Sequence, residues 1–203
     1  MIAEHDDEPV RGLPGFLPAG ERILWQGSPD AVSLAKSAFH IRTVALYFGL
    51  LVTFSAVQVV RGVGSWFGTG MTLSVGLLGL GVIALLAWGS ARTTIYTVTN
   101  KRIVLRFGMA LPKCVNLPLR ELQSADLRPL AGGHGDIALT IGAEQRLGWL
   151  QLWPHARPWA INVVKPMLRS IGEAENVAGL IARTAGNVQG APAIAAPVLA
   201  VAA

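Results

Sequence analysis

The sequence predicts an α+β membrane protein. A hairpin of two transmembrane helices is followed by a small antiparallel β barrel or sandwich capped by a C-terminal helix. Three observations carry this prediction. Two long uncharged apolar runs occupy residues 43–60 and 71–91. After Arg92 the pattern changes to short alternating segments between turn residues, and from Glu173 it changes to the spacing of an amphipathic helix.

The composition separates this chain from ordinary soluble enzymes. Of its 203 residues, 52% are apolar and only 14% are charged, whereas about a quarter of a typical soluble domain is charged. The single cysteine excludes an internal disulfide, and the four histidines show no zinc-binding spacing. The net charge of +5 on an apolar chain favours an anionic membrane surface over nucleic acid as a partner.

The two apolar runs have the length of membrane spans. At 1.5 Å per residue, run 43–60 extends roughly 27 Å and run 71–91 roughly 31 Å, close to the bilayer core of about 30 Å. The alternative, a buried helix pair in a soluble protein, is disfavoured by these lengths. The glycine-rich link 61–70 is predicted to be a periplasmic loop, with Trp66 and Phe67 at the membrane interface.

Positive charges predict the orientation of the hairpin. Lys36 and Arg42 precede the first run and several basic residues follow the second, whereas the link contains only Arg61. The positive-inside rule therefore predicts that both termini are cytoplasmic. The glycines of the second run permit close helix approach, which leaves open packing within the hairpin, docking on another membrane protein or a homodimer.

Residues 93–186 are predicted to form one cytoplasmic β domain. The β-branched segment 93–99 and the segment 102–107 flank an Asn-Lys turn and predict a β-hairpin. Five further strands are predicted at 113–119, 121–128, 136–142, 146–152 and 160–165. The final helix is predicted to pack on the sheet through three residues at helical spacing, Val177, Leu180 and Ile181.

The segments outside this domain are also assigned. Residues 17–42 are predicted to supply one strand and a juxtamembrane helix. Residues 1–16 are predicted to be a mobile N-terminal segment. The Ala/Pro-rich residues 187–203 are predicted to be a disordered tail.

Two motifs resemble the bacterial membrane-anchored pleckstrin-homology-like (PH-like) domain proteins. They are GERILWQGSP at residues 20–29 and TTIYTVTNKRIVLRFG at residues 93–108. The resemblance implies a PH-like fold, in which two roughly orthogonal antiparallel sheets are capped by a C-terminal helix. It also implies that residues 20–27 add a strand to the domain.

A closer resemblance is to the PuhB family, the photosynthetic-complex assembly proteins of purple phototrophic bacteria. The similar segments are EPVRGLPG at 8–15, LPAGERILWQG at 17–27, SARTTIYTVTNKRIV at 90–104, GDIALT at 135–140 and LWPHARPW at 152–159. This resemblance implies a non-enzymatic assembly factor in the inner or intracytoplasmic membrane. Its partners would be subunits of the reaction centre and the core light-harvesting complex. The alternative is a generic PH-like lipid-binding or scaffold protein unrelated to photosynthesis.

The segment LWPHARPW at residues 152–159 is the candidate partner-binding site. Its two prolines stiffen the chain, and tryptophan and arginine are enriched at binding hot spots. The predicted contact residues are Trp153, His155, Arg157 and Trp159. The alternative is that the tryptophans fill the core or lie at the lipid interface.

Four basic residues are predicted to contact anionic lipid at the membrane boundary: Arg92, Lys101, Arg102 and Arg106. Each cation near an anionic surface contributes about 1 kcal/mol. This general attraction is favoured over a specific phosphoinositide-type headgroup site.

No cofactor, metal or enzymatic activity is predicted. His40 has a side chain that can ligate the magnesium of a bacteriochlorophyll, but it lies outside the apolar run, so an ordinary interfacial histidine is favoured. The residue types of a hydrolase occur at Ser124, Asp126, His134 and Asp136, yet no G-x-S-x-G motif surrounds the serine.

Overall fold

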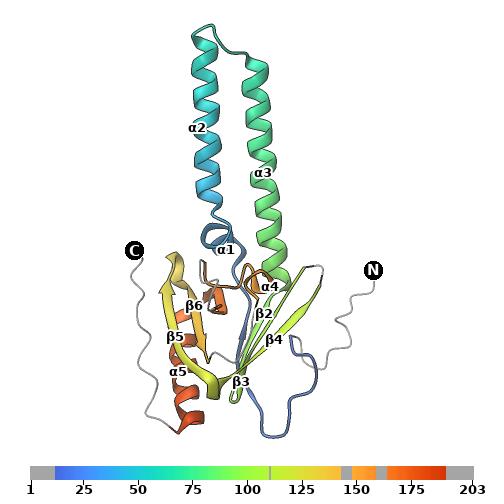
Figure 1. The fold of residues 1–203 in the computed structure, drawn as a ribbon, viewed down its shortest axis with the longest axis vertical. Helices are drawn as coiled ribbons and strands as arrows, with labels where there is room; N and C mark the ends of the chain where they lie inside the picture. Colours follow the sequence, from blue (N-terminus) through green and yellow to red (C-terminus); the bar gives the residue numbers. More distant parts are fainter. Residues whose placement is uncertain (1–11, 110, 143–147, 159–163, 191–203) are drawn as a thin grey trace.

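The computed structural model describes residues 12–109, 111–142, 148–158 and 164–190. It consists of a β domain and two long helices that project from one end of that domain (Figure 1). We call this end of the β domain the hairpin-proximal end. The predicted α+β architecture, with two apolar helices, antiparallel sheets and a C-terminal helix, is confirmed.

The two long helices are α2 (Ile41–Val60) and α3 (Trp66–Thr93), and both are long and apolar enough to cross a membrane. Helix α3 begins earlier than predicted. The side chain of Ser65 caps it by accepting a hydrogen bond from the N–H of Phe67 at 3.2 Å. The predicted loop is correspondingly shorter, and Trp66 and Phe67 lie in the first turn of α3.

The helices pack on each other along one side only. A Cβ added at Gly76 would lie 2.9 Å from Cγ of Phe48, so glycine there permits the close approach of α3 to α2. The hydroxyls of Ser55 and Thr69 lie 2.8 Å apart across the pair. None of the α2 side chains is buried. The apolar side chains of these helices therefore lie mostly on the outside of the structure. The helix pair is not buried in a core of this chain, so that alternative is not adopted.

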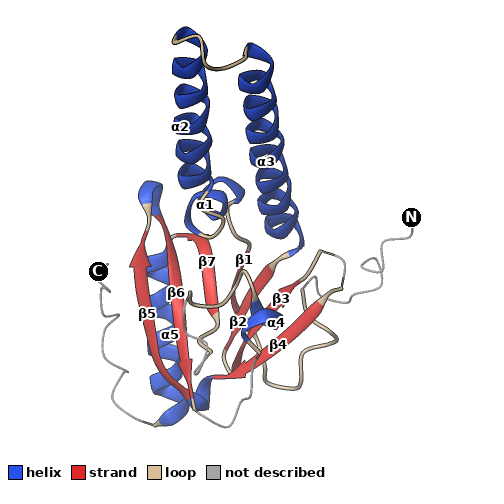
Figure 2. Cartoon of the chain, turned by 45° about the horizontal axis from the view of Figure 1, so that its top comes forward, coloured by secondary structure: helices blue, strands red, loops and turns tan. Residues whose placement is uncertain are grey.

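The β domain contains two antiparallel sheets (Figure 2). The first has the order β1-β2-β3-β4 and consists of β1 (Ile23–Gly27), β2 (Ile95–Thr99), β3 (Arg102–Phe107) and β4 (Lys113–Pro118). The second has the order β5-β6-β7 and consists of β5 (Leu122–Pro129), β6 (His134–Ile141) and β7 (Met167–Gly172). The two sheets form an open sandwich, so the predicted alternative of a closed barrel is not adopted.

Short helical segments connect these strands. They are α1 (Ala31–Ser37), the 3-10 turns η1 (Leu119–Glu121) and η2 (Ala131–Gly133), and α4 (Trp149–Leu152). Helix α5 (Ala174–Gln189) follows β7 and packs against β5, β6 and η1.

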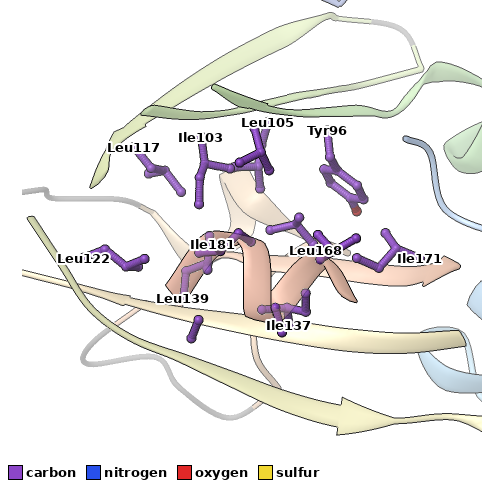
Figure 3. Close-up of a cluster of buried hydrophobic side chains, with 14 of the residues drawn as sticks. Tyr96, Ile103, Leu105, Leu117, Leu122, Ile137, Leu139, Leu168, Ile171 and Ile181 are labelled. Carbon is purple, nitrogen blue, oxygen red and sulfur yellow. The ribbon is translucent and has the colours of Figure 1, made fainter. Parts of the chain in front are cut away.

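The hydrophobic core lies between the two sheets (Figure 3). Tyr96, Ile103 and Leu105 point into it from the first sheet, and Ile137 and Leu139 point into it from the second. Strand β7 and helix α5 complete the core with Leu168, Ile171, Val177 and Ile181. Leu180, predicted to pack with them, is only half-buried and is not part of this cluster.

The helical hairpin is an insertion between the first two strands of the first sheet. Strand β1 pairs antiparallel with β2, although the whole hairpin separates them in the sequence. The pair is extended by the N–H of Arg22, which donates to Oδ1 of Asn100 at 2.9 Å. Only Thr94 separates α3 from β2, so α3 leads directly into the sheet.

One of the predicted strands is wrong, and another lies mostly outside the described residues. Within 146–152, residues 149–152 form α4, which places Trp149 and Leu152 against the core on one helical side. Residues 160–163 of the second candidate lie outside the described residues, and the third strand of the second sheet is β7. Strand β7 was not predicted, because Arg169 and Ser170 at its centre interrupt the apolar pattern although both are buried.

The predicted ends also need correction. Residues 1–11 and 191–203 lie outside the described residues. Leu13, assigned to the mobile N-terminal segment, is buried at 1% exposure. Gln189, assigned to the disordered tail, lies in α5 and donates to the carbonyl oxygens of Leu119 and Leu122 at 3.0 and 2.8 Å.

Candidate functional site

The segment 152–158 lies at the hairpin-proximal end of the domain, where α3 enters the sheet and α1 crosses it (Figure 1). Backbone bonds fix the segment. The N–H of Arg157 donates to the carbonyl of Lys165 at 2.9 Å, and the N–H of Met167 donates to the carbonyl of His155 at 2.8 Å. The segment is therefore attached to residues 165–167, where the chain enters β7, rather than forming a free loop.

The buried side chain of His155 holds this segment against the domain. Its imidazole is 1% exposed, with Nδ1 lying 2.7 Å from the Tyr96 hydroxyl and Nε2 lying 3.1 Å from Oγ1 of Thr94. The Tyr96 hydroxyl accepts the backbone N–H of Arg169 at 3.2 Å. It therefore has its own proton to donate to Nδ1, which assigns the Nε2–H tautomer donating to Thr94.

The chain of contacts Thr94–His155–Tyr96–Arg169, which we call the buried relay, joins the foot of α3 to β2 and β7. Burial, with a smaller contribution from the Arg169 charge, lowers the pKa of His155 to about 3, so the imidazole is neutral at physiological pH. Burial likewise raises the pKa of Tyr96 above its usual value. The relay is thus a neutral hydrogen-bonded network beside one buried cation.

Arg169 and Asp136 are both buried and interact electrostatically. Oδ1 of Asp136 accepts the backbone N–H of Ser170 at 2.8 Å. Burial raises the pKa of Asp136, against the opposing effect of the Arg169 cation and this hydrogen bond. Among the described residues, Oδ2 of Asp136 and Nε of Arg169 have no hydrogen-bond partner.

A β-bulge places these groups. The register of β6 and β7 shifts between Gly135 and Ile137, so Arg169 and Ser170 together face Asp136. Ser170 has a left-handed backbone with φ of 50°. The bulge turns Ser170 toward α1, where its Oγ lies 3.0 Å from Oγ of Ser37 and its carbonyl accepts the N–H of Asp30 at 2.8 Å. The same bulge therefore joins the core to the helix that precedes the hairpin.

Trp153 and Arg157 lie on the outer side of this fixed segment. Trp153 is 48% exposed, and its ring meets Phe39 edge-on at a centroid distance of 5.4 Å. The Arg157 guanidinium lies 3.9 Å from Oδ2 of Asp126, a long contact between two partly exposed groups. We call Phe39, Trp153 and Arg157 the Trp153 surface. Trp153 is thus not a core residue, and Trp159 lies outside the described residues.

His155 is a correction to the predicted contact set. The sequence placed it beside Trp153 and Arg157 as a partner-binding residue. In the fold it is inaccessible, because it points into the core between Tyr96 and Phe107. Its contribution to any surface is therefore indirect, through holding the segment.

The four predicted lipid-contacting residues do not form one group. Lys101 and Arg102 lie at the β2–β3 turn, at the opposite end of β2 from α3 (Figure 1). Five strand residues separate them from the foot of α3, roughly 17 Å, about twice the Debye length at physiological ionic strength. Arg102 is instead paired with the buried carboxylate of Glu21 at 2.8 Å. Lys101 and Arg102 therefore lie at the end of the domain away from the hairpin, and the four predicted residues are not brought together.

The other two basic residues do lie at the hairpin-proximal end. Arg92, in the last turn of α3, is exposed and stacks over the ring of Trp88 at 5.2 Å from its centroid. Arg106 lies on β3 opposite Ile95, at the start of β2. Both positions are compatible with the predicted contact to anionic lipid.

The residue types of a hydrolase are dispersed. Oγ of Ser124 donates to Oγ1 of Thr140, and Asp126 faces Arg157. Asp136 is buried opposite Arg128, four residues further along β5 from Ser124. Within the described part of the chain, no group of three or more histidine, cysteine or acidic residues could hold a metal ion.

Sequence reasoning missed Tyr96, Arg169 and Ser170. For Tyr96 the available signal was a large polar side chain inside an apolar strand, which predicts a buried partner. Arg169 and Ser170 gave no such signal, because the strand that carries them was not recognised in the sequence. The partners themselves could not be read from the sequence, because Tyr96 and His155 are 59 positions apart.

Comparison with known proteins identifies the family of this chain and one similar protein. The model of the bacterial PH domain family matches residues 34–185. An uncharacterized 23.7 kDa protein in the puhA 5' region of Rhodobacter capsulatus is 37% identical over 193 residues, covering 90% of this chain and 87% of that protein. No solved structure matches. With two sheets of four and three strands and a C-terminal helix, the chain belongs to the bacterial PH domain family.

Proposed function

We propose that this protein is a non-enzymatic assembly factor for the photosynthetic reaction centre and its core light-harvesting complex. In this proposal α2 and α3 cross the inner or intracytoplasmic membrane, and both chain ends and the β domain are cytoplasmic. The hairpin contacts transmembrane helices of the client subunits, and the Trp153 surface contacts their cytoplasmic parts.

The observation that carries the proposal is the half-exposed Trp153 on a segment fixed by a buried histidine. A large aromatic side chain held rigidly at the surface loses little conformational freedom on binding, which is what hot-spot residues require. Among the described residues, the ion pair of its neighbour Arg157 is the long contact to Asp126, from which the guanidinium can turn to a partner's carboxylate. Both residues lie beside the foot of the hairpin, where a membrane-embedded client would emerge.

The exposed apolar side chains of α2 and α3 support a role in the membrane. Leu46, Leu50 and Phe54 of α2 and Leu77 and Leu78 of α3 are each more than 60% exposed. Lipid or a partner's transmembrane helices would cover them. The basic residues at the hairpin-proximal end favour a cytoplasmic location for the domain.

The photosynthetic part of the proposal rests on two resemblances. The sequence resembles the PuhB family, and the similar Rhodobacter capsulatus protein is described by its position 5' of puhA. This gene neighbourhood supports a photosynthesis-related role for the relative, and we extend that role to this chain.

A deletion strain tests the proposal. Growth under phototrophic conditions, near-infrared absorption of isolated membranes and immunoblots of reaction-centre and core antenna subunits would be compared with wild type. We expect reduced levels of both complexes, restored by the wild-type gene on a plasmid. Unchanged levels of both would contradict the assembly role.

The second candidate function is a lipid-binding or scaffold module unrelated to photosynthesis. It is favoured by the basic residues at the hairpin-proximal end of the domain. In that case deletion would impair growth or envelope integrity equally in phototrophic and respiratory cultures. A defect confined to phototrophic growth supports the first function.

A further inference from the structure

A pocket of about 250 Å³ lies at the hairpin-proximal end of the domain, between α1, the first turn of α2 and the end of β5. Four basic side chains line it: Lys36, His40, Arg42 and Arg128. The hydroxyl-bearing Ser33 and Ser37 complete its polar wall. Three elements that are distant in the sequence thus combine into one basic, hydroxyl-rich cavity.

Helix α1 supplies one wall because of its amphipathic pattern. Ser33, Lys36 and Ser37 are spaced i, i+3 and i+4 and share a face. Leu34 and Ala35 occupy the other side and are buried. The packing of α1 on the domain therefore directs its polar face to the pocket.

The positive charge of the pocket is only partly neutralised within the fold. Among the described residues, Lys36, Arg42 and Arg128 form no salt bridge. Asp30 interacts electrostatically with Lys36, but its carboxylate is already engaged as the cap of α1, accepting the N–H of Ser33 at 2.7 Å. The hydrogen bond from Ser33, with smaller contributions from the charges of His134 and Lys36, lowers the pKa of Asp30. Asp136, which faces Arg128 across the β5–β6 pair, also interacts electrostatically with Arg128, but it is shared with Arg169. The three permanent cations of the pocket therefore retain a net positive charge.

The start of α2 adds to the positive potential. His40 is its N-cap residue in a left-handed conformation with φ of 51°, and it makes no side-chain cap hydrogen bond. The first turn of this 20-residue helix contains no acidic residue. A long helix that begins uncapped beside cationic side chains favours an anion at this position.

We propose that this pocket binds the phosphate group of an anionic membrane lipid. Arginine, lysine and serine side chains all donate to phosphate oxygens. If α2 crosses a bilayer from Ile41, the pocket lies at the depth of the headgroups, and the acyl chains run along the apolar surface of α2. Its volume is below the roughly 300–1,000 Å³ of a whole small-molecule site, which suits a phosphate with part of its headgroup.

This site goes beyond the proposed assembly role and beyond general attraction to a charged surface. It specifies one lipid at one place, and it excludes Lys101 and Arg102. The lipid-binding proposal does not depend on whether the partner proteins belong to the photosynthetic complexes. A failure of the deletion experiment would leave it intact, and a failure of lipid binding would leave the assembly role intact.

The full-length protein, purified in detergent, would be titrated with phosphatidylglycerol, and bound lipid would be counted by native mass spectrometry. Phosphatidylcholine serves as the zwitterionic comparison, and inorganic phosphate at a few millimolar serves as the competitor. We expect one tightly held phosphatidylglycerol, little retained phosphatidylcholine and no displacement by inorganic phosphate.

The variant Lys36→Gln/Arg128→Gln should weaken phosphatidylglycerol binding about thirtyfold, because each cation near an anionic surface contributes about fivefold. The matched control, Lys101→Gln/Arg183→Gln, removes the same charge outside the pocket and should bind within about twofold of wild type. A melting temperature for each variant verifies folding, and the two single variants carry the test if the double variant is unstable. Equal weakening in both double variants would overturn the pocket in favour of general attraction. Displacement by inorganic phosphate would overturn the lipid in favour of a soluble phosphate ligand.

Discussion

The Tyr96 hydroxyl lies 2.7 Å from Nδ1 of His155, and this buried contact fixes the position of the segment that exposes Trp153. Tyr96 belongs to β2, directly after the long helix α3, so the same contact ties the candidate docking segment to the foot of the hairpin. A client that binds the Trp153 surface would therefore bind a rigid extension of the membrane helices.

Removing the Tyr96 hydroxyl should destabilise the domain. In Tyr96→Phe, Nδ1 of His155 and the N–H of Arg169 both lose their partner at buried positions, and each unsatisfied group costs about 1–3 kcal/mol. We expect a lower melting temperature of the purified protein. Tyr47→Phe is the matched control, because Tyr47 is exposed on α2. Equal melting temperatures for the two variants would contradict the buried relay.

The lowered pKa of His155 predicts acid sensitivity. The folded state holds a neutral imidazole with a pKa of about 3, whereas the unfolded value is 6.5. The stability due to this group is therefore fully present above pH 6.5 and is lost as the pH falls from 6.5 toward 3. Each pH unit in that window costs about 1.4 kcal/mol. At pH 5 the expected loss is about 2 kcal/mol.

Comparison with His155→Gln isolates this effect, because other groups such as Asp136 titrate in both proteins. The variant should be less stable at pH 7.5, but its melting temperature should fall less steeply between pH 6.5 and 5. Parallel curves for the two proteins would mean that His155 does not remain neutral in the fold.

The final helix offers a test of the core. Ile181 is fully buried, so Ile181→Ala should cost about 2–5 kcal/mol of folding free energy. Leu180→Ala should cost clearly less, because its side chain is half-buried outside the core cluster. Limited proteolysis and thermal melting of the two variants measure this difference. The reverse order would show that α5 packs through another face.

The Trp153 surface predicts a separation of binding from folding. Trp153→Ala and Arg157→Ala should each weaken client binding by about 2 kcal/mol, roughly thirtyfold, if they are hot spots. Protein levels in the membrane should stay near wild type, because both side chains are about half exposed and lie outside the core. Leu152→Ala, at a buried position in the same segment, is the control and should lower abundance instead. Normal complex assembly in the Arg157→Ala strain would count against the docking surface.

The hairpin predicts a topology. A reporter fused at Gly64 should lie in the periplasm, and one fused after Gly190 should lie in the cytoplasm. The second position follows α5, whereas a fusion at Ala185 would interrupt the helix at a buried residue. Leu80→Arg should cost about 2.5–3.5 kcal/mol of insertion free energy and deplete the protein from membranes. A cytoplasmic signal at Gly64 would remove the hairpin from the proposal.

The elements that could be predicted from the sequence are those whose signals are local. The uncharged runs of α2 and α3, the Asn100-Lys101 turn between β2 and β3 and the helical spacing of α5 all depend on residues within a few turns of one another. The residue types of the Trp153 surface were also visible, since Trp153 and Arg157 lie four positions apart. What the sequence could not provide was which side chains of that segment face outward, because a segment without regular periodicity carries no information about direction.

The buried relay and the basic pocket could not be predicted, because each is formed by residues that are distant in the sequence. His155 is a core residue because β2 and β7 bring Tyr96 and Arg169 to it from distant parts of the chain, and burial makes it neutral. Arg128 joins Lys36 in one cavity, whereas Lys101 is held away from it by the length of β2. Charge and hydrogen-bonding capacity are properties of single residues. Their effects depend on distance and on exclusion of water, which the packing of the two sheets against α1 and the hairpin sets.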